Sequence, residues 1–160
     1  MSESEFLEQV RINQGIIYKL VGLYANNTEE KKDLYQEILL QAWRGWPSFR
    51  GDARFSTWLY RLTLNTIFTQ KRKKHRIEYR ESMDDSSSPV QNVFLQKEEA
   101  GRLKLAIRQI SEIDRAIITM HLDGYENPEI GSMMGISDNL VSVKLHRIKK
   151  QLANFLNKEL

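Results

Sequence analysis

The sequence predicts an all-α protein made of two small helical domains, and three observations carry this prediction. Apolar residues recur every three or four positions along most of the 160 residues, and no segment shows the two-residue alternation of a half-buried strand. Residues 77–96 interrupt the pattern with few apolar side chains and a run of aspartate, serine and proline, a composition typical of a flexible linker. Near the carboxyl end, a glycine-containing turn separates a short helical pattern from a longer one. We therefore expect domains at residues 1–76 and 97–160.

The composition is that of a globular protein and excludes several kinds of chemistry. Cysteine is absent, which excludes disulfides, thiol catalysis and thiolate metal sites and is compatible with a reducing cytoplasm. The amino terminus is acidic where a secretory signal is basic, and no apolar run approaches the roughly 20 residues that cross a bilayer. We expect a cytoplasmic protein without membrane insertion or cofactor. The net charge of +3 is weak evidence for nucleic acid, because the placement of charge matters more than its sum.

The first two predicted helices lie before residue 47. Residues 5–25 carry apolar side chains at a helical spacing. After a short polar break, Thr28 is expected to cap a second helix, and Glu29 and Glu30 suit the positive end of its dipole. Pro47 ends that helix, because proline lacks an N–H donor and clashes with the preceding turn. The apolar positions of the second helix are Leu34, Ile38, Ala42 and Trp46.

A loop and a third helix complete the first domain. Residues 47–55 contain proline, glycine and aspartate and are expected to form the loop. Ser56 or Thr57 can cap the helix, which runs into the basic cluster Lys71–Arg76. The three helices are expected to form one bundle. The apolar positions of the third helix are Trp58, Leu62 and Ile67.

The second domain is predicted to begin with two more helices. Leu95 or Lys97 opens the fourth helix. Ser111, three residues before Asp114, resembles a capping box at the start of the fifth helix. Gly124 fits the end of that helix, because glycine is common just past a helix C-terminus.

A helix-turn-helix is predicted at the carboxyl end. Asn127 before Pro128 is a matched start signal for a short helix that ends at Gly135. Ser137 or Asp138 then caps a final helix that runs to about residue 156. One face of this final helix is apolar and carries Val141, Leu145, Ile148, Leu152 and Phe155. The opposite face carries Asn139, Val143, His146, Arg147 and Lys150, with Ser142 at its edge.

This two-faced helix is typical of a recognition helix, whose back packs on its domain and whose front enters the major groove. The alternative is a solvated basic helix on a structural αα-hairpin. His146 fits a surface or phosphate-proximal position better than a metal site, because His75 and His121 have no ligand-like spacing to it. We expect no metal site.

Aromatic and basic residues mark the loop and the third helix as a candidate nucleic-acid surface. Trp43 and Trp58 are expected in the core. The loop side chains can stack on an unpaired base, or the two phenylalanines can pin the loop to the core; the sequence leaves both open. Lys71–Arg76 is either a solvated helix end or a phosphate-binding element. The loop residues are Phe49, Arg50, Arg54 and Phe55.

An acidic-polar patch on the second helix has another character. Asp33 and Glu37 are four residues apart and share a helix face with Gln36. No histidine, nucleophile or glycine-rich phosphate loop accompanies them, so an active site is not expected. The patch is either a solvated face or a protein-binding face.

Taken together, these residues resemble the extracytoplasmic-function (ECF) sigma factors of bacteria, over nearly the whole chain. Asp33–Trp43 resembles the core-binding helix of that family, and Phe49–Arg61 with Asn65 resembles its promoter-melting loop and helix. Gly135–Ser137 and Leu145–Arg147 resemble parts of its second DNA-binding domain. The order of these motifs, with a linker of suitable length between them, makes the resemblance specific.

The resemblance implies a partner and a non-enzymatic role. Asp33, Gln36 and Glu37 would contact the clamp helices of the RNA polymerase β′ subunit, and the second domain would dock on the β flap. The loop at residues 48–56 would capture a flipped base of the −10 element, and Asn65 with the following helix would contact its upstream edge. The sequence has no ATPase motif, so binding energy would drive melting. The residues implied in −10 binding are Phe49, Arg50, Arg54, Phe55, Arg61, Asn65, Lys71 and Arg72.

For the −35 element, the resemblance implies readout of duplex DNA by the final helix. Two positions depart from the usual family pattern: Ser142 stands where a basic residue is frequent, and Glu126–Pro128 replaces the more usual Ser-Tyr-Glu. The first puts one phosphate or base contact in doubt, and the second alters a helix cap. The implied −35 residues are Ser142, Val143, His146, Arg147 and Lys150.

The rival interpretation is a helix-turn-helix regulator that binds duplex operators without polymerase. A second rival is an adaptor that binds only proteins. A repressor has no need of loop aromatics beside an acidic-polar helix, and it would usually be a symmetric dimer. The sigma-factor interpretation predicts a monomer when free that reads two unlike elements, and the family also admits an anti-sigma factor as a partner.

Overall fold

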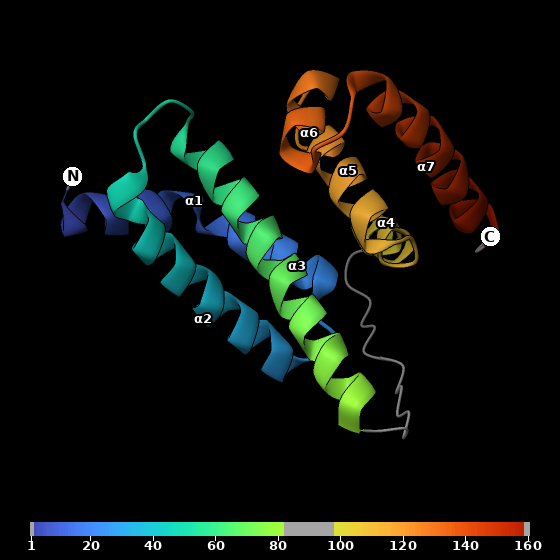
Figure 1. The fold of residues 1–160 in the computed structure, drawn as a ribbon. Coiled ribbons are helices and arrows are strands. Elements are labelled where there is room, and N and C mark those ends of the chain that lie inside the picture. Colours follow the sequence, from blue (N-terminus) through green and yellow to red (C-terminus); the bar gives the residue numbers. More distant parts are fainter. Residues whose placement is uncertain (1, 82–97, 159–160) are drawn as a thin grey trace. The chain divides into compact units, whose positions relative to one another are not determined.

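The computed structural model describes the chain at residues 2–81 and 98–158 (Figure 1). These residues form helices and turns and contain no strand, which confirms the predicted all-α class. Internal contacts divide the chain into two compact units, Met1–Asn92 and Val93–Leu160. Residues 82–97, most of the predicted linker, lie outside the described residues.

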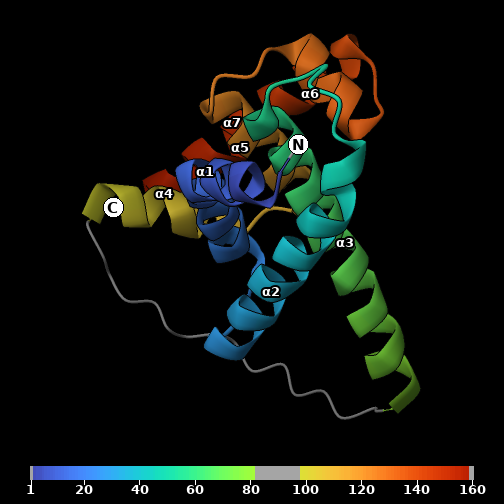
Figure 2. The same cartoon turned by 90° about the vertical axis from the view of Figure 1, so that its left-hand side faces the viewer.

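Unit 1 is a bundle in which each of three α-helices packs against the other two (Figure 1). The helices are α1 (Glu3–Tyr24), α2 (Thr28–Gly45) and α3 (Phe55–Glu81), and the 3-10 turn η1 (Trp46–Ser48) follows α2. The last turns of α3 extend beyond α1 and α2 (Figure 2). Because α3 continues to Glu81, the first five residues assigned to the linker are helical. The core includes Ile17, Leu20, Ile38, Leu59 and Ile67, all fully buried.

Apart from the C-terminal end of α3, the helix boundaries in unit 1 differ from the predicted ones by a residue or two. Asn27, not Thr28, caps α2: its side-chain Oδ1 accepts a hydrogen bond of 2.8 Å from the backbone N–H of Glu30. Asparagine fits this role better because its side chain reaches a free N–H of the first turn from an extended backbone. Helix α3 begins at Phe55, just before the predicted caps. Pro47 lies inside η1, and α2 ends two residues before it.

The described residues of unit 2 form four helices, and α7 packs against the other three. They are α4 (Glu98–Arg108), α5 (Glu112–Leu122), α6 (Asn127–Met134) and α7 (Asp138–Lys158). The α6–turn–α7 segment is the predicted helix-turn-helix. The core of unit 2 includes Ala116, Ile117, Met120, Ile130 and Val141, all fully buried.

Local signals set the ends of the helices in unit 2. The Ser111 hydroxyl accepts from the backbone N–H of Asp114 at 3.2 Å, and the Ser137 hydroxyl accepts from that of Leu140 at 3.1 Å, so both predicted caps are confirmed. Gly135 has φ 74° at the end of α6, a left-handed conformation that other residues adopt at a cost. The start of α6 was predicted one residue late. Its cap is Glu126, whose backbone N–H donates to the Glu129 side chain at 3.0 Å.

Gly131 sets the spacing between α6 and the turn. A Cβ at this position would lie 2.6 Å from the backbone oxygen of Ile136, closer than real Cβ atoms come. We expect Gly131→Ala to destabilise unit 2 by about 1–3 kcal/mol, the usual range for overpacking. Hydrogen exchange read by mass spectrometry, which resolves α6 and α7, measures this loss. Gly15→Ala in α1 is the control: nothing lies within 4 Å of its Cβ position, so faster exchange after both changes would contradict this account.

Candidate nucleic-acid and protein interfaces

The acidic-polar patch lies on the outer face of α2. Asp33 and Gln36 are exposed, and Glu37 is partly exposed, with its carboxylate accepting from the Gln41 amide at 2.8 Å. Leu40 is 41% exposed and lies on the same face, one helical turn after Gln36 and Glu37. Leu40 was not among the predicted interface residues, although its place outside the apolar stripe of α2 is a signal for an exposed apolar side chain. The patch thus contains an apolar side chain beside the carboxylates, which suits a protein partner more than a solvated surface.

Trp43 is not a core residue, contrary to the prediction. It is 44% exposed, and its ring meets the Phe6 ring in an edge-on arrangement at a centroid distance of 5.2 Å. The reason is helical phase: Ala42 takes the core-facing position, so the next side chain points about 100° away from it. Trp58, the other tryptophan expected in the core, is half-buried. Trp43 adds a second exposed apolar side chain to the surface of α2.

The loop after η1 is pinned by a cluster of four aromatic rings. Phe49 stacks on Trp46 at 5.7 Å between centroids and meets Phe55 at 5.8 Å, and Phe55 lies 5.3 Å from Trp58. Phe55 is only 8% exposed, so most of its ring is packed in this arrangement, and its base contact stays a prediction. Phe49 is half-buried and keeps part of its ring open.

The exposed part of this loop borders an open groove. Arg50 and Arg54 are both exposed. Arg54 and Phe49 line a groove of about 630 Å³ whose other wall is formed by polar side chains at the start of α1. The structure therefore brings three aromatic rings, of Trp46, Phe49 and Phe55, and the Arg54 guanidinium group to one open groove, and aromatic rings are groups on which an unpaired base stacks.

Three of the predicted −10 residues form a stripe along α3. Arg61, Asn65 and Arg72 are exposed, and intervals of four and seven residues place them on one face of the helix. Arg61 and Asn65 also line a groove of about 410 Å³ between α3 and α2, and Glu37 lines its opposite wall. The structure thus brings the acidic-polar patch and the predicted DNA-binding stripe to the two sides of one groove.

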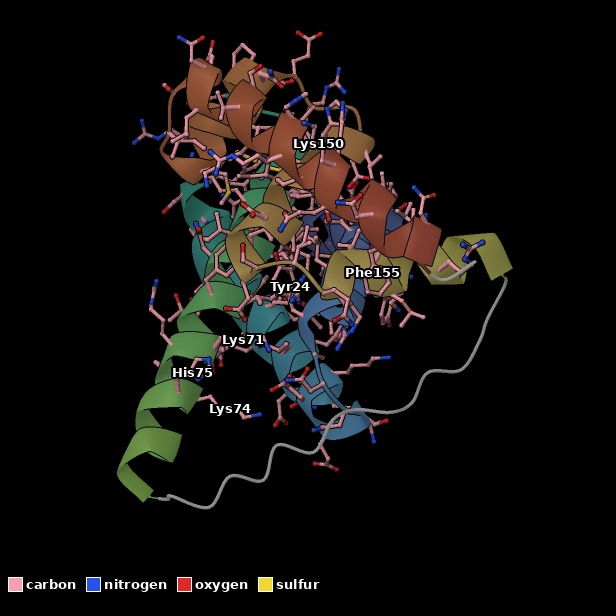
Figure 3. The ribbon with its side chains drawn as sticks, turned by 90° about the vertical axis from the view of Figure 1, so that its right-hand side faces the viewer. Tyr24, Lys71, Lys74, His75, Lys150 and Phe155 are labelled. Atoms are coloured by element: carbon pink, nitrogen blue, oxygen red, sulfur yellow. The ribbon has the colours of Figure 1, made fainter. Side chains whose placement is uncertain are left out.

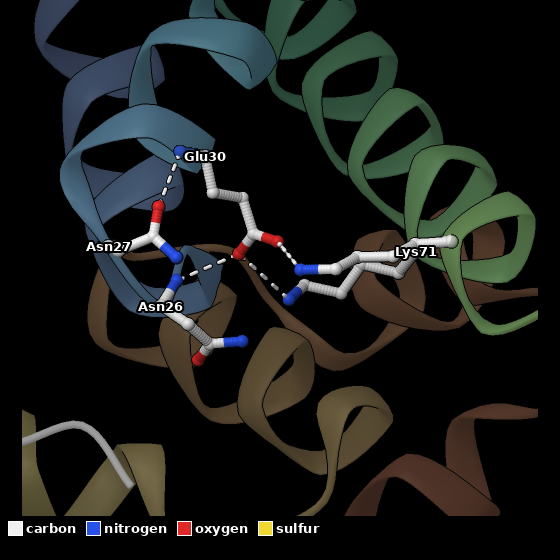
Figure 4. A network of polar contacts seen from close by, with 5 residues as sticks. Asn26, Asn27, Glu30 and Lys71 are labelled. Carbon is white, nitrogen blue, oxygen red and sulfur yellow. Dashed lines mark hydrogen bonds and ion pairs between the residues drawn. The ribbon is translucent and has the colours of Figure 1, made fainter. Parts of the chain in front are cut away.

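Lys71 does not belong to that stripe, although we expected it to contact DNA. Its side chain is 12% exposed, and its Nζ lies 3.5 Å from Glu30 Oε1, across from the start of α2. Lys74 Nζ donates to Glu30 Oε2 at 2.8 Å. Figure 4 shows both ammonium groups converging on one carboxylate. In this arrangement Lys71 joins two helices of unit 1.

The Glu30 carboxylate is ionised across the neutral range. Burial acts to raise its pKa, but the hydrogen bond from Lys74, the backbone N–H of Asn26 and the charges of Lys71 and Lys74 outweigh burial, so its pKa is lowered. Because the pKa is lower in the folded chain, the ionised Glu30 carboxylate stabilises the fold at pH values above its unfolded-state pKa of about 4.5. This stabilisation is lost as the pH falls through the folded-state pKa.

This sign gives an acid-stability prediction. We expect Glu30→Gln to lower the melting temperature of unit 1 at about pH 6, and the difference from the parent chain to shrink as the pH falls well below 4.5. Thermal melts followed by tryptophan fluorescence measure it, because all three tryptophans lie in unit 1. A melting difference that stays the same down to about pH 3 would show that the carboxylate charge contributes nothing.

In unit 2, the two faces of α7 are arranged as predicted. Val141, Leu145, Ile148 and Leu152 are buried, and Phe155 is half-buried at the end of this face. Figure 3 shows Lys150 and Phe155 on α7. Lys144 lies 3.8 Å from Asp114 of α5, which supports the orientation of the helix. The exposed face carries all the predicted −35 residues: Ser142, Val143, His146, Arg147 and Lys150.

Other kinds of site are not found in the part of the chain that the structure describes. No group of three histidine, aspartate or glutamate side chains there could hold a metal ion. No helix among the described residues combines the length and the apolar character needed to cross a membrane. The candidate surfaces are therefore the α2 face, the loop with the α3 stripe, and the exposed face of α7.

Both units match regions of one protein family. Residues 10–77 match sigma-70 region 2, and residues 100–152 match sigma-70 region 4. These regions define the chain as an RNA polymerase sigma factor, with unit 1 carrying region 2 and the helix-turn-helix lying in region 4. The chain belongs to the ECF group of the sigma-70 family.

Similar proteins point to the same group. The chain is 28% identical to the ECF RNA polymerase sigma factor SigM of Mycobacterium tuberculosis, over 88% of this chain and 71% of that protein. It is 27% identical to the ECF RNA polymerase sigma factor SigW of Bacillus subtilis, over 94% and 90% of the two chains. It is 29% identical to the ECF RNA polymerase sigma-E factor of Escherichia coli K12, over 76% and 71%.

Solved structures share the fold. The sigma factor RpoE of Bartonella quintana, in complex with the anti-sigma factor NepR, has a TM-score of 0.79 at 17% identity and covers 96% of this chain and 97% of its own. CnrH, in complex with the cytosolic domain of CnrY, has a TM-score of 0.70 at 18% identity, over 99% and 92% of the two chains.

Proposed function

We propose that this sigma factor divides promoter recognition among its three exposed surfaces. The α2 face binds core RNA polymerase, the loop with the α3 stripe holds the −10 element, and the exposed face of α7 reads the −35 element. The observation that carries the proposal is the groove in which Glu37 of α2 faces Arg61 and Asn65 of α3. A polymerase-binding surface and a strand-binding surface on adjoining helices would couple the two binding events.

The polymerase contact is assigned to Asp33, Gln36 and Glu37, with Leu40 at the same face. Carboxylates contribute orientation and rate of association, and an exposed leucine contributes apolar area. The proposed docking partners are the clamp helices of the β′ subunit for α2 and the β flap for unit 2. These assignments come from the family and are compatible with the exposure of the α2 face.

The −10 element is assigned to Phe49, Arg50, Arg54, Arg61 and Asn65, with Arg72 at the far end of the stripe. Stacking of one base on an aromatic ring contributes about 1–3 kcal/mol, which offsets part of the cost of unpairing. The chain would thus melt DNA by capturing an opened strand rather than by hydrolysing a nucleotide. In this proposal it is a regulator and not an enzyme.

Replacing Phe49 tests the role of the loop. We expect Phe49→Ala to weaken binding to single-stranded −10 DNA by about 5- to 150-fold, the equivalent of one stacked base, and to leave −35 duplex binding unchanged. Fluorescence anisotropy with the two DNA probes measures both. Phe55→Ala is the comparison, since loss of a buried ring should also lower the melting temperature of unit 1. Equal losses on both probes would show that Phe49 acts only in folding.

We further propose that the protein is cytoplasmic and is monomeric when free. An anti-sigma factor is a further expected partner, because the similar RpoE and CnrH structures are complexes with NepR and with the cytosolic domain of CnrY. Sedimentation of the purified chain tests the first point. A stable symmetric dimer that binds a palindromic duplex would favour the rival regulator without polymerase.

Strand opening is the direct test of the proposed mechanism. Core polymerase and the chain are incubated with genomic DNA fragments, and thymines in unpaired DNA are mapped by permanganate reactivity. The proposal predicts short reactive segments at discrete sites only when both proteins are present. Reactive sites that appear with core polymerase alone, or none with both proteins, would contradict it.

A further inference from the structure

The basic cluster at the end of α3 is divided by the structure into two groups that the sequence does not distinguish. Lys71 and Lys74 both pair with Glu30, although the Lys71 side chain is 12% exposed and that of Lys74 is 49% exposed. Arg72 and Lys73 are exposed and take no part in these pairs. Figure 3 shows Lys71, Lys74 and His75 along α3. A cluster that looks like one uniform phosphate-binding element therefore presents only part of its charge.

Glu30 is held in place from its own helix. Its backbone N–H donates to the Asn27 cap at 2.8 Å, and its Oε1 accepts from the backbone N–H of Asn26 at 2.8 Å. The side chain is 13% exposed, and the carboxylate cannot turn to solvent without giving up the Asn26 contact. In Figure 4 the Asn26 bond holds the carboxylate, the Asn27 bond caps the helix, and the other two bonds attach the lysines to the acid.

The lysines and the DNA-binding stripe lie on different sides of α3. At 100° per residue, Arg72 lies within about 20° of the Arg61 and Asn65 directions. Lys71 and Lys74 lie about 100° and 160° away from Arg72 and continue the side that packs against α1 and α2. A DNA strand that follows the stripe would therefore meet Arg72 before it met either lysine.

From this geometry we propose that Glu30 is a positioning residue that withholds Lys71 and Lys74 from nucleic-acid phosphate and confines the DNA contacts at this end of α3 to the side of Arg72. The inference rests on the proposed DNA-binding role of unit 1. A carboxylate and a phosphate compete for the same ammonium groups. Here the carboxylate has the advantage, because it belongs to the same chain as the lysines and is part-buried. The effect would be to lower the affinity for arbitrary DNA, which is mainly electrostatic, more than the affinity for a promoter.

The test compares two glutamates that are neighbours in the first turn of α2. Glu30→Gln should release both lysines, whereas Glu29→Gln removes the same charge from an exposed side chain that none of the ion pairs above involves. We expect the slope of log K against log salt for a non-specific duplex to steepen by about one to two for Glu30→Gln, because each added phosphate contact contributes about 0.9. Glu29→Gln should leave the slope unchanged. Equal slopes for the two variants would overturn the inference.

Two further variants, one of an arginine and one of a lysine, keep the test decisive if Glu30→Gln unfolds unit 1. Arg72→Gln should reduce the slope by about one, and Lys71→Gln should leave it as in the parent chain. A reduction by Lys71→Gln as large as that by Arg72→Gln would overturn the inference.

Elution from immobilised heparin separates this inference from the proposed function, because heparin reports accessible positive charge without any promoter or polymerase. Glu30→Gln should elute at higher salt than Glu29→Gln. If that order holds but the parent chain neither binds −10 DNA nor opens promoters, the proposed function fails and the withholding of the lysines stands. Elution of both variants at the same salt overturns the inference alone.

Discussion

Replacement of Asp33, Gln36 and Glu37 together by alanine is expected to abolish measurable association with core RNA polymerase. The three side chains lie on one accessible face of α2, and a hot-spot residue at the centre of an interface contributes about 2 kcal/mol or more. Even one such loss weakens binding by more than about 10-fold, so three should weaken it by at least about 100-fold. Alanine favours helix, and circular dichroism of the variant should match that of the parent chain.

The control is a triple alanine variant on another helix. Glu3, Glu8 and Gln14 are exposed on α1 and provide the same number of carboxylates and amides. Size-exclusion chromatography with core polymerase should show association of the control and not of the α2 variant. If the α2 variant still co-elutes with polymerase, the assignment of the α2 face is wrong.

Arg147→Ala is expected to have the largest single effect on −35 recognition. Arg147 is exposed on the face of α7 opposite its buried stripe, where a guanidinium group can contact a base edge or a phosphate in the major groove. Loss of an arginine bound to a base edge costs about 1–3 kcal/mol, which is about 5- to 150-fold in affinity for −35 duplex. Relaxed sequence preference at one base pair should accompany the loss.

Lys149→Ala separates a base contact from a general loss of charge. Lys149 is exposed but lies about 160° around α7 from Arg147. Its replacement by alanine therefore removes the same charge from a different side of the helix. Anisotropy with −35 duplexes changed at each position should show reduced affinity and reduced discrimination for Arg147→Ala, and little change for Lys149→Ala. A uniform loss across all duplexes for Arg147→Ala would assign it to phosphate instead.

Most of the fold could be predicted from the sequence because its determinants are local. The period of Val141, Leu145, Ile148 and Leu152 depends only on the pitch of one helix, and all four are buried. The hydroxyl caps of α5 and α7 involve partners three residues away. The errors in the fold were at helix ends: neighbouring cap residues compete, as Asn27 does with Thr28, and α3 continues five residues into the predicted linker.

The remaining features depend on contacts that no local pattern encodes. The Glu30–Lys71 pair joins residues 41 positions apart, so nothing in the basic cluster itself indicates that two of its members are occupied. Phe55 and Trp43 were assigned by residue type, but the packing of a four-ring cluster and the phase of α2 decided their burial. A sequence pattern identifies which residues are available for a function, and tertiary packing decides which of them remain exposed.

The most direct measurement for the whole account is the mapping of transcript 5′ ends made by core polymerase on genomic DNA, with and without this chain. The account predicts a small set of start sites that appear only with the chain, each preceded by the same two elements at a fixed spacing, one for α3 and its loop and one for α7. Transcripts whose start sites are the same with and without the chain would contradict it.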